Sequence, residues 1–359
     1  MIKKILVVNP FGIGDVLFST PVLKAIKKKY PDASITYICN RRAEGVLRNN
    51  ANINDIYIYE KDDYREIWKK SKIKCVKAVY SLIKKIRNDK YDVMIDMSLG
   101  YIYSLFLGTL ASIPFRIGFN YRDRGMFMSR KVDVDGFKDK HVIEYYLELG
   151  KFLGLDPSDK DMELRVLPED AEWANKFISD RGVAGTDKVC GIVPGCGASW
   201  GKNAHYRRWS AWKFVELADY LADKHGYKII ILGSRKESSI CLKVQSDMKH
   251  EAIQACGKTD LAQLAALMDK CDLIITNDGG PLHMAVALKK KTVSIFGPVD
   301  PVVYGPYPLN ERHIVITSDD ACRPCYKSFK HNECKELNCL KNINVEKVIK
   351  AAEMLMGPK

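Results

Sequence analysis

The sequence predicts an α/β protein of two doubly wound domains, each a mostly parallel sheet covered by helices. Short apolar runs alternate with amphipathic helical patterns, and this alternation starts again after residue 185. The 359 residues, of which 47% are hydrophobic, exceed the usual size of one domain and suffice for two cores. We therefore expect an N-terminal domain over residues 1–165 and a second domain over residues 185–342, with the boundary between 155 and 185.

Each half contains runs typical of buried strands. The predicted strands are 5–8, 34–39, 56–59 and 93–97 in the first half and 189–193, 228–232, 252–255, 273–276 and 292–296 in the second. The predicted helices include 15–29, 142–153 and 212–222. Segment 116–140 is rich in Gly, Asp and Arg and is expected to be irregular. The final segment, 343–359, is expected to carry a helix that docks back on the N-terminal domain.

The charge distribution indicates an anionic partner. The formal net charge is +13, and residues 1–165 carry 30 Lys and Arg against 21 Asp and Glu. No motif interleaves basic and aromatic residues as nucleic-acid-binding segments do, so we expect no nucleic-acid partner. No run reaches the roughly 18 apolar residues of a membrane span, and the first apolar stretch is shorter than the core of a signal peptide. A cytoplasmic protein is therefore expected.

The turn after the first strand reads Gly12-Ile13-Gly14-Asp15. It resembles the start of a dinucleotide fingerprint, but Leu17 stands where the third glycine belongs. Asp15 begins the helix, where a carboxylate repels a pyrophosphate instead of binding it. We expect Asp15 to cap the helix and also, being held ionised at the helix start, to be able to accept a proton from an attacking hydroxyl.

Two loops of the second domain have the composition of a phosphate site. The loop 194–199 consists of small residues that let a ligand approach the backbone, ends at Ser199, and is followed by Lys202 and Arg207. The strand 273–276 runs into a second loop in which glycines precede a proline at a helix start, an arrangement that holds phosphate on backbone N–H groups. The candidate donor-binding residues of this second loop are Asp278, Gly279, Gly280 and His283.

Taken together, these motifs resemble glycosyltransferase family 9, the lipopolysaccharide core heptosyltransferases, over nearly the whole chain. The matching elements are Gly14-Asp15, Pro194-Gly195, Arg207-Arg208-Trp209, Leu232-Gly233 with Glu237, and Asn277-Asp278-Gly279-Gly280 with His283. The resemblance implies a GT-B fold, in which two Rossmann-like domains face each other across a cleft. It also implies an inverting reaction, with ADP-L-glycero-β-D-manno-heptose as the usual donor.

The resemblance further implies roles for single residues. The catalytic base of the family falls on Asp15, and a basic donor contact falls on Arg207, where the best-known members carry Lys. The acid that binds the ribose falls on Glu237, and the acid that contacts the sugar falls on Asp278. We expect the acceptor to be a lipid-linked acidic saccharide such as the lipopolysaccharide inner core, reached at the inner face of the membrane. The candidate acceptor-binding residues are Gly14, Arg116, Arg122 and Arg124.

No metal is expected in catalysis, since one carboxylate suffices for direct displacement. Asp133-Val134-Asp135 resembles a carboxylate pair for Mg²⁺, but the alternation also fits a strand with one wet face, which we favour. A separate cluster suits a structural zinc or iron site, with free thiols as an equally weighted alternative. Its members are Cys322, Cys325, Cys334 and Cys339.

Two other functions compete with sugar transfer. An NADP-dependent oxidoreductase is the first, because Arg41-Arg42 follows the second strand where a 2′-phosphate would lie. Asp15 and Leu17 argue against it. A non-catalytic module that only binds a nucleotide-sugar is the second.

Overall fold

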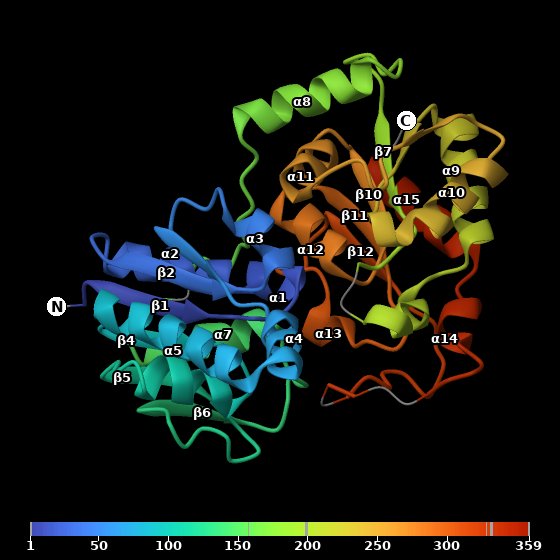
Figure 1. Cartoon of the computed structure of the whole chain (residues 1–359). Helices are drawn as coiled ribbons and strands as arrows, with labels where there is room; N and C mark the ends of the chain where they lie inside the picture. The colour runs from blue at the N-terminus through green and yellow to red at the C-terminus, as the bar shows by residue number, and fades with distance from the viewer. Residues whose placement is uncertain (1, 157, 198–199, 328, 331–332, 358–359) are drawn as a thin grey trace. The chain divides into compact units, whose positions relative to one another are not determined.

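The computed structural model describes residues 2–156, 158–197, 200–327, 329–330 and 333–357, and for Lys202 only the backbone. The chain divides into two compact units, Met1–Met162 and Glu163–Lys359 (Figure 1). Both units are parallel α/β structures.

The first unit contains a six-stranded sheet in the order β3-β2-β1-β4-β5-β6, with every neighbouring pair parallel. Its strands are β1 (Lys4–Val8), β2 (Ser34–Cys39), β3 (Asp55–Ile58), β4 (Val93–Asp96), β5 (Phe115–Tyr121) and β6 (Arg130–Val134). Leu6 of β1 is in register with Thr36 on one side and Met94 on the other. The strand order therefore reverses between β1 and β4, where ligands of doubly wound sheets bind.

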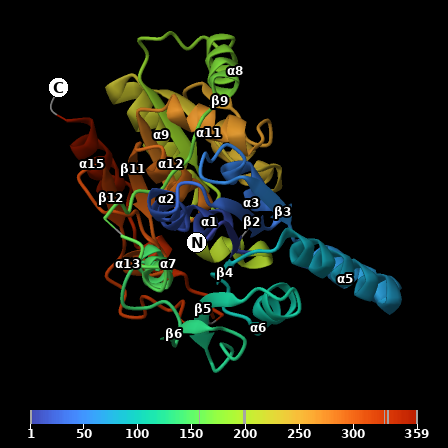
Figure 2. The same ribbon diagram turned by 90° about the vertical axis from the view of Figure 1, so that its left-hand side faces the viewer.

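Helices cover both faces of this sheet (Figures 1 and 2). They are α1 (Ile13–Phe18), α2 (Thr20–Lys29), α3 (Arg41–Leu47), α4 (Lys61–Lys70), α5 (Lys72–Asp89), α6 (Tyr101–Tyr103), the π-helical turn η1 (Ser104–Thr109) and α7 (Val142–Lys151). Ile86 of α5 and Leu107 of η1 pack on the sheet face that carries Leu6. On the other face, the Tyr37 hydroxyl lies 2.7 Å from that of Ser19, between α1 and α2.

The second unit repeats the design with the order β12-β11-β10-β7-β8-β9. Its strands are β7 (Val189–Val193), β8 (Lys228–Ile231), β9 (Ala252–Gln254), β10 (Leu273–Asn277), β11 (Lys291–Ile295) and β12 (His313–Ile316). Its helices are α8 (Pro168–Ser179), η2 (Gly201–Arg207), α9 (Ala211–His225), η3 (Arg235–Glu237), α10 (Ser238–Asp247), α11 (Leu261–Asp269), α12 (Gly280–Ala287), α13 (Pro301–Tyr304), α14 (Asn338–Lys341) and α15 (Val345–Met356). Here the order reverses between β7 and β10.

The C-terminal helix contributes to the core of the second unit. α15 packs on α9 and β11 of its own unit, while its expected docking on the N-terminal domain stays a prediction. Its buried side chains Val348 and Ala352 belong to the core that also contains Trp209. The Trp209 indole and the Lys213 ammonium both donate to the carbonyl of Ile343, at 3.0 and 2.6 Å, which fixes the chain entering α15.

Three segments differ from the sequence-based expectation. Segment 116–140, expected to be irregular, contains most of β5 and all of β6. The strand favoured at the Asp-Val-Asp stretch agrees with β6, which ends with Asp133 and the buried Val134 and is followed by Asp135. The predicted helix 15–29 is broken at Ser19, because Pro21 in the first turn of α2 has no N–H to continue the hydrogen bonding of α1. The edge strand β12 was not predicted. No helix in the described part of the chain is long and apolar enough to cross a membrane.

Candidate active site

The loops after β7 and β10 meet at the switch point of the second sheet. A Cβ atom on Gly279 would lie 2.2 Å from the carbonyl oxygen of Cys196, and one on Gly195 would lie 2.0 Å from a carboxylate oxygen of Glu237. Only glycine fits at both positions. The glycines that the sequence analysis assigned to ligand approach therefore also serve the close packing of the two loops.

Glu237 fastens the loop after β7. One of its carboxylate oxygens accepts hydrogen bonds from the N–H groups of Cys196 and Gly197 at 2.8 and 2.9 Å, and the other accepts from the N–H and hydroxyl of Ser234. Burial alone raises the pKa of Glu237, but these hydrogen bonds outweigh it and hold the pKa below its usual range. The carboxylate is therefore ionised and already engaged, while its predicted contact with ribose stays a prediction.

Asn277 performs a role that the sequence analysis did not assign. Its side-chain amide donates to the carbonyls of Pro194 and Gly195, both at 2.9 Å, while its oxygen accepts from the N–H of Trp209 at 2.9 Å. This fully buried side chain joins β10 to two other segments of the site. Its place within the quoted Asn-Asp-Gly-Gly motif was the one available signal.

Arg207 and Asp278 form a buried, two-pronged ion pair. The Arg207 Nε lies 2.8 Å from one carboxylate oxygen of Asp278, and an Arg207 Nη lies 2.7 Å from the other. Burial raises the pKa of Asp278, and the charge of Arg207 acts in the opposite direction. The guanidinium carbon also lies 5.1 Å from the centre of the Trp200 ring. The structure thus brings two predicted donor residues into contact with each other.

The N-terminus of α12 presents backbone N–H groups next to this ion pair. Gly279 is the residue before the helix, Pro281 lies in its first turn, and no acidic side chain occupies that turn. Such an end binds anions through its N–H groups and its dipole. His283, one turn into the helix, is buried, in keeping with a packing role.

Two predicted donor residues lie outside what the structure describes. Ser199 is among the residues that are not described, and the side chain of Lys202 is likewise not described. Both therefore stay predictions from the sequence.

In the first unit, Asp15 lies in the first turn of α1, next to Gly14. Its carboxylate accepts from the N–H of Gly12 at 3.1 Å, which is the capping contact expected of it. The preceding loop is held by Asn9, which donates to the backbone carbonyl of Asp15 at 3.0 Å, and by Asn40, which donates to two loop carbonyls. The half-buried carboxylate is thereby fixed at the switch point between β1 and β4.

A second acid ends the neighbouring strand β4. Asp96 is fully buried, and one of its oxygens accepts from the N–H of Ser98 at 2.8 Å. Burial raises the pKa of Asp96 to about 7, and the hydrogen bonds of Ser98 oppose the shift. The sequence analysis did not select it, since an acid at the end of an apolar run resembles an ordinary strand end.

The predicted acceptor arginines fall into two groups. Arg116 is half-buried and donates to the backbone carbonyls of Phe127 and Ile113 at 2.7 and 2.5 Å, so it holds the connection between β5 and β6. Arg122 and Arg124 are exposed, with their guanidinium carbons 4.9 and 5.8 Å from the Tyr121 ring centre. These two are available to an anion, whereas Arg116 is mainly engaged within the protein.

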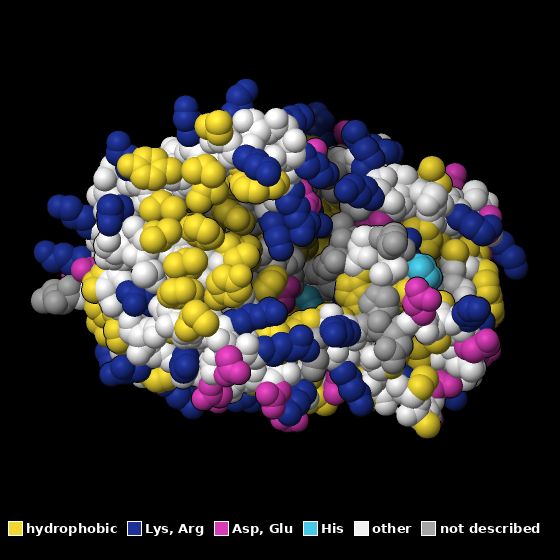
Figure 3. Space-filling view, turned by 60° about the horizontal axis from the view of Figure 1, so that its bottom comes forward, with side chains coloured by type: hydrophobic (Ala, Val, Ile, Leu, Met, Phe, Trp, Pro, Cys, Tyr) yellow, Lys and Arg dark blue, Asp and Glu magenta, His cyan; other side chains and the backbone are white. Residues whose placement is uncertain are grey.

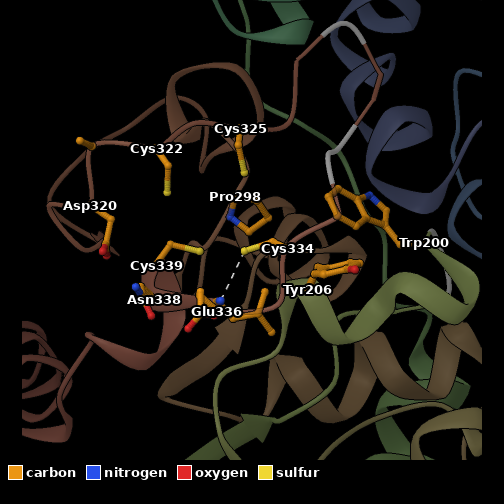
Figure 4. A pocket seen from close by; sticks show the side chains of 12 residues that line it. Trp200, Tyr206, Pro298, Asp320, Cys322, Cys325, Cys334, Glu336, Asn338 and Cys339 are labelled. Atoms are coloured by element: carbon orange, nitrogen blue, oxygen red, sulfur yellow. Dashed lines mark hydrogen bonds between the residues drawn. The ribbon is translucent and has the colours of Figure 1, made fainter.

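The cysteine cluster lines one cavity of about 380 Å³ together with Trp200, Tyr206 and Pro298 (Figure 4). The four cysteines that line it are Cys322, Cys325, Cys334 and Cys339, all with free thiols. The segment is fastened beyond β11, because the N–H groups of Cys325 and Tyr326 donate to the carbonyl of Pro298. Within the described residues, no three His, Cys, Asp or Glu side chains are arranged to hold a metal ion.

Comparisons with known proteins agree with this architecture. The model of glycosyltransferase family 9 (heptosyltransferase) matches residues 79–336. A lipooligosaccharide heptosyltransferase 2 of Campylobacter jejuni is 27% identical, over 98% of each chain. A family 9 glycosyl transferase of Veillonella parvula superposes with a TM-score of 0.82 at 27% identity, over 99% of this chain and 97% of that one.

An E. coli heptosyltransferase solved with ADP superposes with a TM-score of 0.71 at 17% identity, over 97% of this chain and 98% of that one. At that identity the likeness concerns the fold, which is GT-B in this group. The family match covers well over half of the residues and is independent of the contacts described above. The chain belongs to glycosyltransferase family 9 and is a glycosyltransferase.

Proposed function

We propose that the protein transfers a heptose from ADP-heptose to a hydroxyl of the lipopolysaccharide core, with inversion at the anomeric carbon. The observation that carries the proposal is the arrangement after β7 and β10, where a glycine-lined backbone and the acid-free first turn of α12 suit the diphosphate of a nucleotide-sugar. The heptose and the acceptor class rest on the relatives, which are named as lipooligosaccharide or lipopolysaccharide heptosyltransferases.

In the proposed reaction, Asp15 takes the proton of the acceptor hydroxyl. The acceptor oxygen then forms a bond to the anomeric carbon while the bond from that carbon to the phosphate oxygen breaks, and ADP leaves with the electron pair. The N–H groups at the start of α12 stabilise the negative charge that grows on the leaving diphosphate. The Arg207–Asp278 pair lies beside those N–H groups and sets the position of the loop.

We propose that the acceptor is an acidic, lipid-linked saccharide bound by the first unit. Arg122 and Arg124 carry this proposal, because both guanidinium groups are exposed and stand on the connection from β5 to β6. Charge reversal at these two positions should weaken acceptor binding and leave ADP affinity unchanged.

The cysteine cavity fits a structural metal by its donor set, since four thiols suit zinc or iron. We propose that one such ion draws the four cysteines together and fixes the chain beyond β11, with no part in the transfer step. Elemental analysis of the purified protein should find one zinc or iron per chain, and this content should be lost in Cys322→Ser. If the purified protein contained no metal and Cys322→Ser were as stable as the parent, the alternative of free thiols would be favoured.

The first experiment is calorimetric titration with ADP, UDP, GDP and NADP⁺. Selective binding of ADP supports the proposal, whereas a preference for UDP or GDP retains the mechanism and rules out ADP-heptose. Tight NADP⁺ binding would favour the oxidoreductase.

Activity is then measured with ADP-heptose and a core saccharide. Asp15→Asn should abolish transfer and keep ADP affinity, which also separates an enzyme from a module that only binds. Asp32→Asn, at an exposed turn of the same unit, serves as the matched control and should remain active. Retained transfer in Asp15→Asn would exclude this residue as the base.

A further inference from the structure

The helices α4 and α5 carry a surface that the fold does not use. Of the 18 residues of α5, only Cys75 and Ile86 are buried, and no residue of α4 is. Large apolar side chains are instead exposed on this pair, at 50% for Trp68, 70% for Ile73 and 64% for Tyr80. Figure 2 shows α5 projecting away from the strands of its sheet.

The exposed apolar side chains of α5 follow a helical stripe. Ile73, Val76 and Tyr80 are spaced i, i+3 and i+7, so they lie on one face, and Val76 is 59% exposed. The buried Cys75 and Ile86 lie on the opposite side of the helix, where Cys75 contacts the carbonyl of Tyr64 in α4 and Ile86 packs on the sheet. Packing within the unit uses only the apolar face of α5 that carries Cys75 and Ile86. The apolar face that carries Ile73, Val76 and Tyr80 has no such role.

The apolar surface continues onto the neighbouring segment. The turn η1 contacts α5, and the adjoining residues Tyr101, Ile102 and Leu110 are each between 40% and 45% exposed. Figure 3 shows hydrophobic side chains gathered on a face of the first unit, with Lys and Arg around them. Contiguous exposed apolar area of this kind is characteristic of interaction sites.

The charges on helices α4 and α5 favour an anionic partner. Residues 61–89 contain ten Lys and Arg against four Asp and Glu. Three of these four acids, all on α4, form ion pairs with Arg41, Arg65 and Lys69. In the part of the chain that the structure describes, no acidic side chain forms an ion pair with Lys74, Lys77 or Lys84 of α5. Lys77 follows Ile73 by one helical turn, and Lys84 follows Tyr80 by one helical turn.

We propose that the surface formed by α4, α5 and η1 docks on an anionic lipid bilayer. Trp and Tyr side chains favour the boundary between headgroups and acyl chains, and lysines around an apolar stripe bind anionic headgroups while the stripe enters the boundary. This docking rests on the proposed function, because an enzyme whose acceptor is linked to a lipid meets that acceptor at the membrane surface.

Vesicle sedimentation with the full chain tests the docking. The protein should bind vesicles of phosphatidylcholine mixed with phosphatidylglycerol, and bind vesicles of phosphatidylcholine alone far more weakly. The triple variant Lys74→Glu, Lys77→Glu, Lys84→Glu should lower the partition coefficient at least about 100-fold, and Ile73→Ser with Tyr80→Ser should also lower it strongly. On binding, tryptophan emission should shift to the blue, and Trp68→Phe should remove the shift.

Matched substitutions on the second unit control for general loss of charge or apolar surface. Leu242→Ser with Met354→Ser removes exposed apolar side chains there, and Lys236→Glu with Lys249→Glu reverses exposed charges. These variants should bind vesicles as the parent does. ADP titration of every variant keeps the two proposals apart, since loss of vesicle binding with intact ADP affinity concerns docking alone.

Three outcomes would overturn the docking proposal. They are equal binding to both kinds of vesicle, unchanged binding after the triple charge reversal, and burial of this surface in a dimer of the chain in solution, detected as a change of mass on Ile73→Ser with Tyr80→Ser.

Discussion

At the scale of single residues, the site is held by buried polar contacts between segments distant in the sequence. Asn277 and Glu237 each bind the loop after β7, from the ends of β10 and of η3. The sequence showed that Asp278 and Arg207 are suited to a donor site, but not that they pair, because 71 positions separate them. Sequence motifs indicate which residue types belong to a site, whereas the contacts between those residues depend on the fold.

The Arg207–Asp278 pair should be needed for stability. Arg207→Ala leaves a buried carboxylate without its cation, so it should lower the free energy of unfolding by about 3–5 kcal/mol. Arg207→Lys keeps the charge but not the two-pronged geometry and should cost less. Urea unfolding measures both, with Arg235→Ala as an exposed control. Equal stability of the alanine variant and the parent would contradict a structural role for the pair.

Asp96 should make stability depend on pH near neutrality. Its pKa is about 7 in the folded protein and near 3.9 when unfolded. Between these values the folded state holds a proton that the unfolded state has released, so stability falls as pH rises from about 4 to 7, by about 4 kcal/mol in all. Asp96→Asn should therefore flatten thermal stability over this range and raise it at pH 8.

Asp92→Asn provides a control of opposite sign. Hydrogen bonds from the N–H groups of Lys3 and Lys4 hold the pKa of Asp92 below its usual range. The ionised carboxylate therefore contributes stability that is present at neutral pH and lost only as pH falls through its folded pKa. If both variants shifted the pH profile in the same direction, the assignment to Asp96 would be untenable.

At the scale of elements, the apolar strands were predictable and the polar ones were not. β2 and β7 begin and end where the sequence predicted, because both are rich in apolar and β-branched residues and lie inside their sheets. β5 was missed because it includes Arg and Asn side chains, and of the edge strand β6 only the end at Asp133 and Val134 was favoured as a strand. β12, four residues at the other sheet's edge, was too short to stand out.

The C-terminal helix should be part of the second core. Val348 of α15 is fully buried, so Val348→Ala should lower the free energy of unfolding by about 2 kcal/mol. Met354 lies on the same helix with 77% of its side chain exposed, and Met354→Ala should change stability by less than about 0.5 kcal/mol. Chemical denaturation followed by tryptophan fluorescence measures the free energy of unfolding of both variants. A neutral effect of Val348→Ala would argue against the observed packing of α15.

At the scale of the whole molecule, the chain contains the same sheet design twice with different contents at the two switch points. The first has the Asp15 carboxylate in its helix turn, whereas the second has glycines and an acid-free turn. In the proposed function, the former repels a diphosphate and the latter binds it. The duplication of the fold was evident from the sequence, and so was this asymmetry, since both follow from local residue types.

The difference between the two switch points predicts where bound ADP slows amide hydrogen exchange. ADP should slow amide hydrogen exchange in the loop after β7 and at the start of α12, because its diphosphate binds those N–H groups, and leave the turn before Asp15 unchanged. Mass spectrometry of exchanged peptides resolves the two units. At a hundredfold excess of ADP over its dissociation constant, the stabilisation amounts to about 2.7 kcal/mol and should appear in the unfolding of the second unit. Protection confined to the first unit would place the donor at Asp15 and reverse the proposed roles of the two domains.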